Sequence, residues 1–210
     1  GADLCIHIVT AEVSAELRTR VGRLADIFQA RFEFHPLQPD QVAQVEGLPL
    51  MKTATAYLTA ASYYRVLLPD ILSPAIDKVL YLDADTIVLD DIGALCGLDL
   101  GPAILGAALD LGSATMAPPR GLPRYVNAGV MVMDLQRWRQ GRYAERCLDF
   151  ARQFPDKVSY GEQCSINHVC ADVIHVLEPR WNRFVVPRPQ PDDATGAGIL
   201  HFITGDKPWH

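Results

Sequence analysis

Short apolar runs alternate along the chain with longer stretches in which apolar residues recur every three or four positions. This pattern predicts strands that alternate with helices. Residues 4–10 and 31–37 are predicted strands, and Ser14 is suited to cap a helix between them. The apolar stripe of this helix consists of Leu17, Val21, Leu24 and Phe28. Strand, helix and strand in this order predict a parallel βαβ unit.

Residues 77–92 form the stretch around which the remaining pattern is arranged. Residues 79–82 carry no charge and suit a strand buried on both faces, as in a parallel sheet covered by helices. Asp83 and Asp85 follow directly, and side chains two positions apart on an extended chain point the same way. We therefore expect the two carboxylates to converge just beyond the end of a strand, where α/β sheets bind ligands. The alternative without a binding role is a polar turn with two solvated aspartates.

The other elements follow the same reasoning. The pattern predicts helices at residues 53–68, 135–154 and 161–170, and strands at residues 101–110, 126–134, 173–177 and 199–204. It predicts loops at residues 111–125 and 180–198, and a loop or an irregular helix at residues 39–51. Pro69 is expected to end the first of these helices. Together the elements predict an α/β fold: one Rossmann-like domain over residues 1–210, with a mostly parallel central sheet and helices on both faces.

Composition narrows the possible functions. The chain has 210 residues, 49% of them hydrophobic, and a formal net charge of −6, which argues against a nucleic-acid partner. Its longest apolar runs fall short of the roughly 20 residues of a membrane span. The five cysteines lack a C-x-x-C spacing and are interpreted as free thiols in a reducing compartment. His7, inside the first strand, is interpreted as a structural histidine of the sheet.

Two convergent carboxylates without a neighbouring Lys or Arg repel each other unless a cation lies between them. A hard divalent ion that also binds phosphate oxygens fits Asp83 and Asp85. Arg65 lies on the apolar stripe of a predicted helix, where it either covers apolar surface or faces an anionic ligand.

Six segments strengthen this interpretation by their order. They are SYYR at residues 62–65, KVLYLDAD at 78–85, LGAALD at 105–110, YVNAGVMVMDLQRWR at 125–139, YGEQCSIN at 160–167 and HFITGDKPWH at 201–210. In this order they resemble the retaining glycosyltransferases of family 8, which include bacterial lipopolysaccharide galactosyl- and glucosyltransferases and glycogenin. The resemblance covers essentially the whole chain.

The resemblance implies a GT-A fold, a UDP-hexose donor and a metal site. By position, Asp83, Asp85 and His201 correspond to the ligands of Mn²⁺, with Mg²⁺ as the alternative ion. Two carboxylate oxygens and one imidazole would leave positions on the ion for diphosphate oxygens. A bound metal would then stabilise the UDP leaving group as a Lewis acid.

The same resemblance implies roles for further residues. Lys207 matches the lysine beside the diphosphate, and Asp110 and Asn127 match positions that bind the donor sugar. Gln163 matches the position on the sugar face opposite the leaving group, where an amide would stabilise an oxocarbenium-like transition state. The remaining positions expected to bind the donor are Arg65, Ala84, Ala128 and Gly205. Glu162 replaces the Asp that is common in its motif.

One departure concerns the N-terminal end. The family begins with a strand and helix whose motif contacts uracil and ribose, whereas residues 4–10 correspond to its second strand. We therefore expect a GT-A domain that lacks the first strand and helix, about thirty residues.

Two alternatives remain beside the transferase. In a haloacid-dehalogenase-type phosphatase, the DADT segment would supply Asp83 as the nucleophile and Asp85 as the acid or base. In a nucleotide-sugar binding module, the same residues would bind the donor without turnover. The preferred hypothesis is a metal-dependent retaining hexosyltransferase that moves galactose or glucose to a glycan or lipopolysaccharide-type acceptor. Its expected location is the cytoplasm, with at most peripheral association at the inner face of a membrane.

Overall fold

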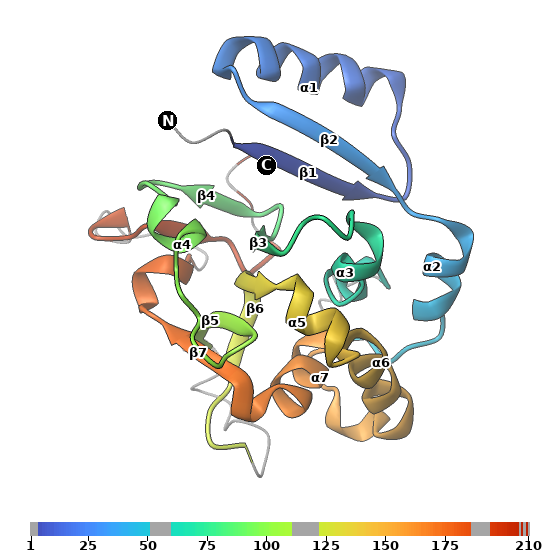
Figure 1. Ribbon diagram of the computed structural model, residues 1–210. Helices are drawn as coiled ribbons and strands as arrows, with labels where there is room; N and C mark the ends of the chain where they lie inside the picture. The colour runs from blue at the N-terminus through green and yellow to red at the C-terminus, as the bar shows by residue number, and fades with distance from the viewer. Residues whose placement is uncertain are drawn as a thin grey trace.

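The computed structural model describes residues 4–50, 60–110, 122–185, 194–205, 207 and 209 (Figure 1). The strands are β1 (Cys5–Thr10), β2 (Arg31–Pro36), β3 (Lys78–Leu82), β4 (Thr86–Val88), β5 (Leu105–Leu109), β6 (Val126–Asp134), β7 (Ile174–Leu177), β8 (Arg183–Phe184) and β9 (Ile199–His201). The α-helices are α1 (Ala15–Phe28), α2 (Pro39–Val45), α3 (Leu68–Ile71), α4 (Gly93–Cys96), α5 (Leu135–Gln140), α6 (Tyr143–Gln153) and α7 (Glu162–Val169). The 3-10 helices are η1 (Ala60–Arg65), η3 (Pro155–Lys157), η4 (Ala171–Val173) and η5 (Pro179–Asn182).

Strands β1 and β2 pair in parallel and form a two-stranded sheet of their own, next to α1. The hydroxyl of Ser14 accepts a hydrogen bond from the Leu17 N–H at 3.1 Å, so the predicted cap is confirmed. The predicted apolar stripe of α1 is covered only in part. Val21 is buried, whereas Leu24 and Phe28 are exposed by 43% and 70%. The strand–helix–strand unit is therefore present, but much of its helix faces outward.

A second sheet has four strands in the order β3-β6-β5-β7. Strand β6 runs antiparallel to both of its neighbours, and only β5 and β7 are parallel. This sheet is mixed, which corrects the expectation of a mostly parallel sheet. A continuous apolar run reports burial on both faces but carries no information on strand direction, because both pairing modes satisfy the backbone. Strand β3, which leads into the two aspartates, lies at the edge of this sheet.

The core lies on both faces of the four-stranded sheet. On one face Met131 and Met133 pack with Trp138 of α5 and Ile166 of α7. On the other face are Val130, Val132, Leu95 of α4, Trp181 of η5 and Ile199 of β9. The alternation along β6 confirms the prediction of helices on both faces, since neighbouring residues of a strand point to opposite sides.

A third sheet continues from the end of β3. Strand β4 pairs antiparallel with β9, and β9 pairs in parallel with β8. Its register places Thr86 opposite His201. The segment directly before β4 therefore lies beside the last strand of the chain.

Three helix predictions need correction. The helix expected over residues 135–154 is broken at Gly141 and Arg142, where Arg142 adopts a left-handed φ of 50°. Pro69 does not end a helix but lies in the first turn of α3, where its missing N–H has no helical partner to lose. The described part of the helix expected at 53–68 is the 3-10 helix η1 together with the start of α3.

Other predictions fall partly outside the description. Residues 53–59, most of the loop expected at 111–125 and part of the loop expected at 180–198 lie outside the described residues. Within the described ranges, no helix combines the length and apolar character needed to cross a membrane.

The central position of β6 predicts where the fold is most sensitive. Met131 of β6 is fully buried in the core that the helices cover, so Met131→Ala should lower the free energy of unfolding by about 2–5 kcal/mol. Urea denaturation followed by circular dichroism measures this. Ile27→Ala is the matched control, because Ile27 is 68% exposed and should change stability by no more than about 0.5 kcal/mol. Equal losses in both variants would contradict the assignment of the core.

Candidate active site

Asp83, Asp85 and His201 converge beyond the end of β3. Asp83 follows β3, Asp85 precedes β4, and His201 ends β9, which lies next to β4. The His201 Nε2 lies 3.6 Å from Asp83 Oδ2 and 3.3 Å from Asp85 Oδ1. One ligand atom from each residue lies within 4.8 Å of the other two. The predicted convergence of the two carboxylates is therefore present, and β9 brings the histidine to it.

Each of the two carboxylates turns only one oxygen toward His201. The other oxygen of Asp83, Oδ1, lies 2.9 Å from a guanidinium nitrogen of Arg65 and accepts a hydrogen bond from the Tyr81 hydroxyl at 2.5 Å. The other oxygen of Asp85, Oδ2, lies 2.6 Å from the ammonium of Lys207. Arg65 and Lys207 therefore each bind the oxygen that points away from His201, and one oxygen of each carboxylate stays beside the imidazole.

Gly129 makes room for this cluster. It lies in β6 opposite the end of β3, where its carbonyl accepts the Asp83 N–H at 2.8 Å. A Cβ at this position would be 2.1 Å from His201 Cε1 and 2.8 Å from Asp83 Oδ2, distances that a real side chain cannot tolerate. Only glycine permits the imidazole and the carboxylate to lie against the strand here.

The pairing of β5 with β6 is irregular at the same place. Ala107 lies opposite Met131 and Leu109 opposite Val126, so β6 has extra residues in this interval. Irregularities of this kind redirect side chains next to functional sites. Here the interval contains Asn127 and Gly129, and the site is built on it.

A chain of amides fixes the orientation of His201. The Gly129 N–H donates to Asn127 Oδ1 at 2.9 Å, and the same oxygen accepts from Asn182 Nδ2 at 2.9 Å. The carbonyl oxygen of Asn182 lies 2.9 Å from His201 Nδ1. An amide oxygen can only accept, so Nδ1 donates a hydrogen bond to it. The other ring nitrogen of His201, Nε2, then faces Asp83 and Asp85.

A second branch of this network ends on a carboxylate. The Ala128 N–H donates to Gln163 Oε1 at 3.0 Å, and Asn127 Nδ2 donates to the same oxygen at 3.1 Å. The Gln163 amide nitrogen therefore donates to Asp110 Oδ2, at 2.9 Å. Asp110, Asn127 and Gln163, all predicted to contact the donor sugar, thus form one hydrogen-bonded group joined to His201 through Asn182.

Arg65 is a buried structural cation of the site. Besides Asp83, it contacts the Glu162 carboxylate at 3.3 Å and donates to the Ala128 carbonyl at 2.8 Å, with Tyr81 stacked beside it. Burial alone would lower the pKa of Arg65, but Asp83 and the other neighbours outweigh it and raise the pKa. The guanidinium therefore stays charged and balances two carboxylates.

Asp85 is held in its charged form as well. Burial alone would raise the pKa of its carboxyl, but the hydrogen bonds with His201 and Lys207 outweigh burial and lower this pKa to about 2. The Lys207 ammonium also donates to the Phe202 carbonyl at 2.5 Å. At neutral pH Asp85 is therefore an anion that is ready to accept a second cation.

The remaining predicted residues are placed less directly. Ala84 is an exposed turn residue between the two aspartates, and Gly205 lies in a half-buried bend between His201 and Lys207. Ala128 takes part through its backbone, which contacts both Arg65 and Gln163. Their expected contacts with a donor stay predictions.

The predicted set does not include Gly129, Asn182 or Tyr81, all of which touch its members. A glycine inside an apolar strand is a sequence signal for close backbone approach, and Gly129 carried that signal. No sequence signal pointed to Asn182, because it lies in a stretch expected to be a loop. Its role depends on the packing of η5 against β6.

The cluster has the ligand chemistry of a divalent metal site. Adjacent ligands of an octahedral ion at about 2.1 Å are about 3 Å apart, near the 3.3 and 3.6 Å from His201 to the two carboxylates. The His201 ring, anchored through Nδ1 with Nε2 toward the carboxylates, matches the second-shell arrangement of metal-bound histidines. Asp83, Asp85 and His201 could therefore hold such an ion.

Solved structures with the same architecture define the class of fold. A galactosyltransferase, LgtC, solved in complex with donor and acceptor sugar analogues, superposes with a TM-score of 0.78 at 25% sequence identity. The match covers 97% of this chain and 78% of that chain. The expected GT-A fold is confirmed, with a mixed sheet.

The sequence itself gives the family. Residues 2–210 match the profile described as Glycosyl transferase family 8, and the chain belongs to this family. General stress protein A of Bacillus subtilis is 29% identical over 175 residues, which are 74% of this chain and 61% of that protein. Lipopolysaccharide 1,2-glucosyltransferase of Escherichia coli is 24% identical over 207 residues, 91% of this chain and 59% of that protein. The chain thus spans about three fifths of the length of these two relatives.

The close approach at Gly129 can be tested without any ligand. Gly129→Ala should destabilise the protein by about 1–3 kcal/mol, because the new methyl group overlaps His201 and Asp83. Gly22→Ala in α1 is the matched control, since a Cβ there meets nothing within 4 Å, and it should leave stability unchanged or raise it by up to about 1 kcal/mol. Thermal unfolding measures both, and a Gly129→Ala protein as stable as the parent would contradict the described packing.

Proposed function

We propose that this chain is the catalytic domain of a metal-dependent retaining hexosyltransferase that uses a UDP-sugar donor. One observation carries the proposal: Asp83, Asp85 and His201 each turn one unshared ligand atom toward the same point. Beside them lies the hydrogen-bonded group of polar side chains that ends at Asp110. A cation-binding cluster next to a group of polar side chains is what transfer from a nucleotide diphosphate sugar requires.

The metal ligands in this proposal are Asp83 Oδ2, Asp85 Oδ1 and His201 Nε2, with Mn²⁺ as the preferred ion and Mg²⁺ as the alternative. When bound, the ion would neutralise the diphosphate and stabilise the departing UDP as a Lewis acid. Two positively charged side chains of the chain support metal binding. Arg65 and Lys207 fix the second oxygens of the two aspartates, so the three ligand atoms are oriented before an ion arrives.

Lys207 has a further role in the proposal. Its ammonium is a compact charge beside Asp85 and belongs to the same segment as His201. A diphosphate held at the cluster would lie within the field of Lys207, which would stabilise the negative charge that develops on the leaving group.

Gln163 and Asp110 would act on the sugar. The Gln163 oxygen already accepts two hydrogen bonds, from Asn127 and from the Ala128 N–H. An amide is a poor nucleophile, and these hydrogen bonds lower the nucleophilicity of this oxygen further. We therefore assign Gln163 to orienting Asp110 and to stabilising an oxocarbenium-like transition state. Asp110, held by Gln163, would accept hydrogen bonds from sugar hydroxyls. Retention of configuration then rests on attack from the face of the departing UDP.

The donor and acceptor are proposed by analogy. The lipopolysaccharide glucosyltransferase among the relatives and the galactosyltransferase among the solved structures suggest glucose or galactose as the donor sugar and a glycan or glycolipid as the acceptor. All five cysteines are free thiols, which supports the proposed cytoplasmic location, with at most peripheral contact at the inner membrane face.

UDP release from a panel of UDP-hexoses tests the proposal. We expect release from one sugar with Mn²⁺ and none with excess chelator. Donor binding without UDP release would instead support a binding module, and cleavage of p-nitrophenyl phosphate would support the phosphatase. No donor binding and no turnover by the chain under any of these conditions would overturn the proposal for these residues.

Asp83→Asn should lower the rate of metal-dependent UDP release by about a hundredfold or more, because it removes a charged ligand of an ion that supplies several kcal/mol. Asp26→Asn on the exposed surface of α1 is the matched control and should keep full activity. Full activity in Asp83→Asn, with chelator still inhibiting, would place the metal elsewhere.

Asn182→Ala tests the positioning network. Without the Asn182 carbonyl, the His201 ring loses the partner that fixes its tautomer, and Mn²⁺ affinity should fall by about 10- to 100-fold. Titration calorimetry measures the affinity, and circular dichroism confirms that the fold is intact. Asn182→Asp keeps an acceptor for Nδ1 but loses the donor to Asn127, so its affinity should lie between those of Asn182→Ala and the parent. Unchanged affinity in Asn182→Ala would remove Asn182 from the site.

A further inference from the structure

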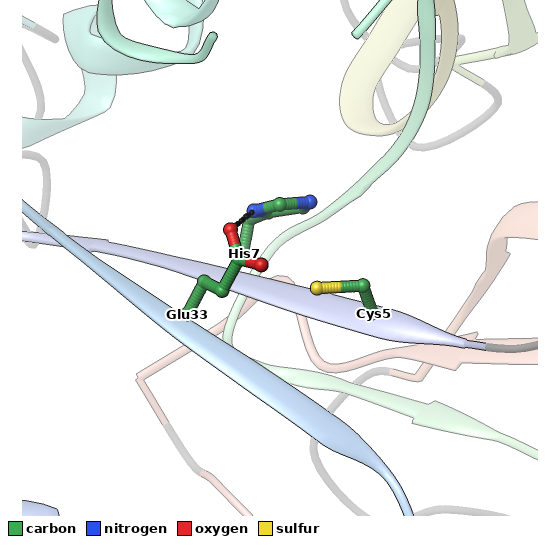
Figure 2. Close-up of side chains that lie close together, drawn as sticks. All are labelled: Cys5, His7 and Glu33. Carbon is green, nitrogen blue, oxygen red and sulfur yellow. Dashed lines mark ion pairs between the residues drawn. The ribbon is translucent and has the colours of Figure 1, made fainter.

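A second cluster of ligand-type side chains lies on the two-stranded sheet, outside the site described above. Cys5 and His7 project from one face of β1, and Glu33 projects from the adjacent strand β2 (Figure 2). Possible ligand atoms of these three residues all lie within 4.8 Å of one another. His7 and Glu33 are opposite each other in the strand register. The parallel pairing therefore brings a thiol, an imidazole and a carboxylate together.

A fourth side chain joins this group. His35 lies two positions after Glu33 on β2, and its Nε2 is 2.9 Å from His7 Nδ1. The same His7 nitrogen is 3.5 Å from Glu33 Oε2. Strand β1 thus carries the pattern Cys-x-His and strand β2 the pattern Glu-x-His. Because residues two apart on a strand share a face, all four side chains lie on one face of the sheet.

The spacing of these atoms fits a small ion. Ligands around a tetrahedral ion at about 2.1 Å are about 3.4 Å apart, close to the 3.5 Å between His7 and Glu33. Small side-chain movements would bring the atoms to that spacing. Glu33 is free to make one, since its side chain is about half exposed.

The protonation of the cluster also suits a metal. Two imidazole nitrogens at hydrogen-bond distance require at least one of them to be unprotonated. Burial and the neighbouring His7 lower the pKa of His35, against a smaller opposing effect of Glu33. A bound cation would ionise the thiol of Cys5.

We propose that Cys5, His7 and Glu33 form a second metal site that binds a borderline-soft divalent ion such as Zn²⁺, with His35 positioning His7 from the neighbouring strand. The mixed sulfur, nitrogen and oxygen set is the chemistry that Zn²⁺ prefers and that Mg²⁺ and Mn²⁺ do not. This replaces the interpretation of His7 as purely structural and of Cys5 as an idle thiol. The site would cross-link β1 with β2, and it does not depend on the proposed transferase activity.

Titration of the full chain with Co²⁺ under reducing conditions tests the site. Co²⁺ reports its ligands, because only a thiolate ligand gives an intense sulfur-to-cobalt charge-transfer band. Asp83, Asp85 and His201 contain no sulfur, so the first cluster cannot give this band. We expect the band at one equivalent per chain and its loss on addition of Zn²⁺. No charge-transfer band in the parent protein would overturn the proposal.

Variants assign the band to these residues. Cys5→Ser should abolish it, while Cys96→Ser, which removes an exposed thiol elsewhere, and Asp83→Asn should both keep it. Glu33→Gln should weaken Co²⁺ binding by at least about tenfold and is expected to fold normally, because Glu33 is largely exposed. A band that persists in Cys5→Ser, or an unchanged affinity in Glu33→Gln, would refute the proposed ligand set.

Discussion

The candidate active site depends on the absence of a side chain at Gly129. The backbone of β6 passes so close to His201 and Asp83 that one added carbon atom would overlap both. Because the strand is this close, the Gly129 N–H also reaches Asn127 and starts the hydrogen bonds that end at His201 Nδ1. A single backbone position therefore sets both the distance and the orientation of the imidazole.

Charge balance explains how three acidic side chains can share a largely buried site. Asp83 and Glu162 are balanced by Arg65, and Asp85 by Lys207. Each aspartate gives one oxygen to its cation and keeps the other beside His201. Buried carboxylates are costly unless they are paired, and this division pairs them without using up the oxygens that an incoming cation would need. The site is thus held in a binding geometry by permanent charges.

The sequence was informative where chemistry follows local spacing and less so where it depends on packing. Asp83 and Asp85 could be placed together because they follow an apolar strand two residues apart. The apolar runs predicted the described strands apart from β4 and β8. The direction of β6 and the edge position of β3 could not be predicted, since burial alone does not encode pairing. His201 was assigned only through the resemblance to a family. Asn182 was missed because its partner lies 55 residues away in the chain.

The two clusters differ in how much of their geometry exists before an ion binds. Asp83, Asp85 and His201 are held by cations and amides that are themselves buried, so little order remains to be gained on binding. Glu33 is half exposed, and among the described residues its sheet has two strands, which are marginally stable without further packing. A cross-link between β1 and β2 would therefore add more order at the second cluster than at the first. Hard oxygen ligands dominate one cluster and a thiol marks the other, so the two would select different ions from the same solution.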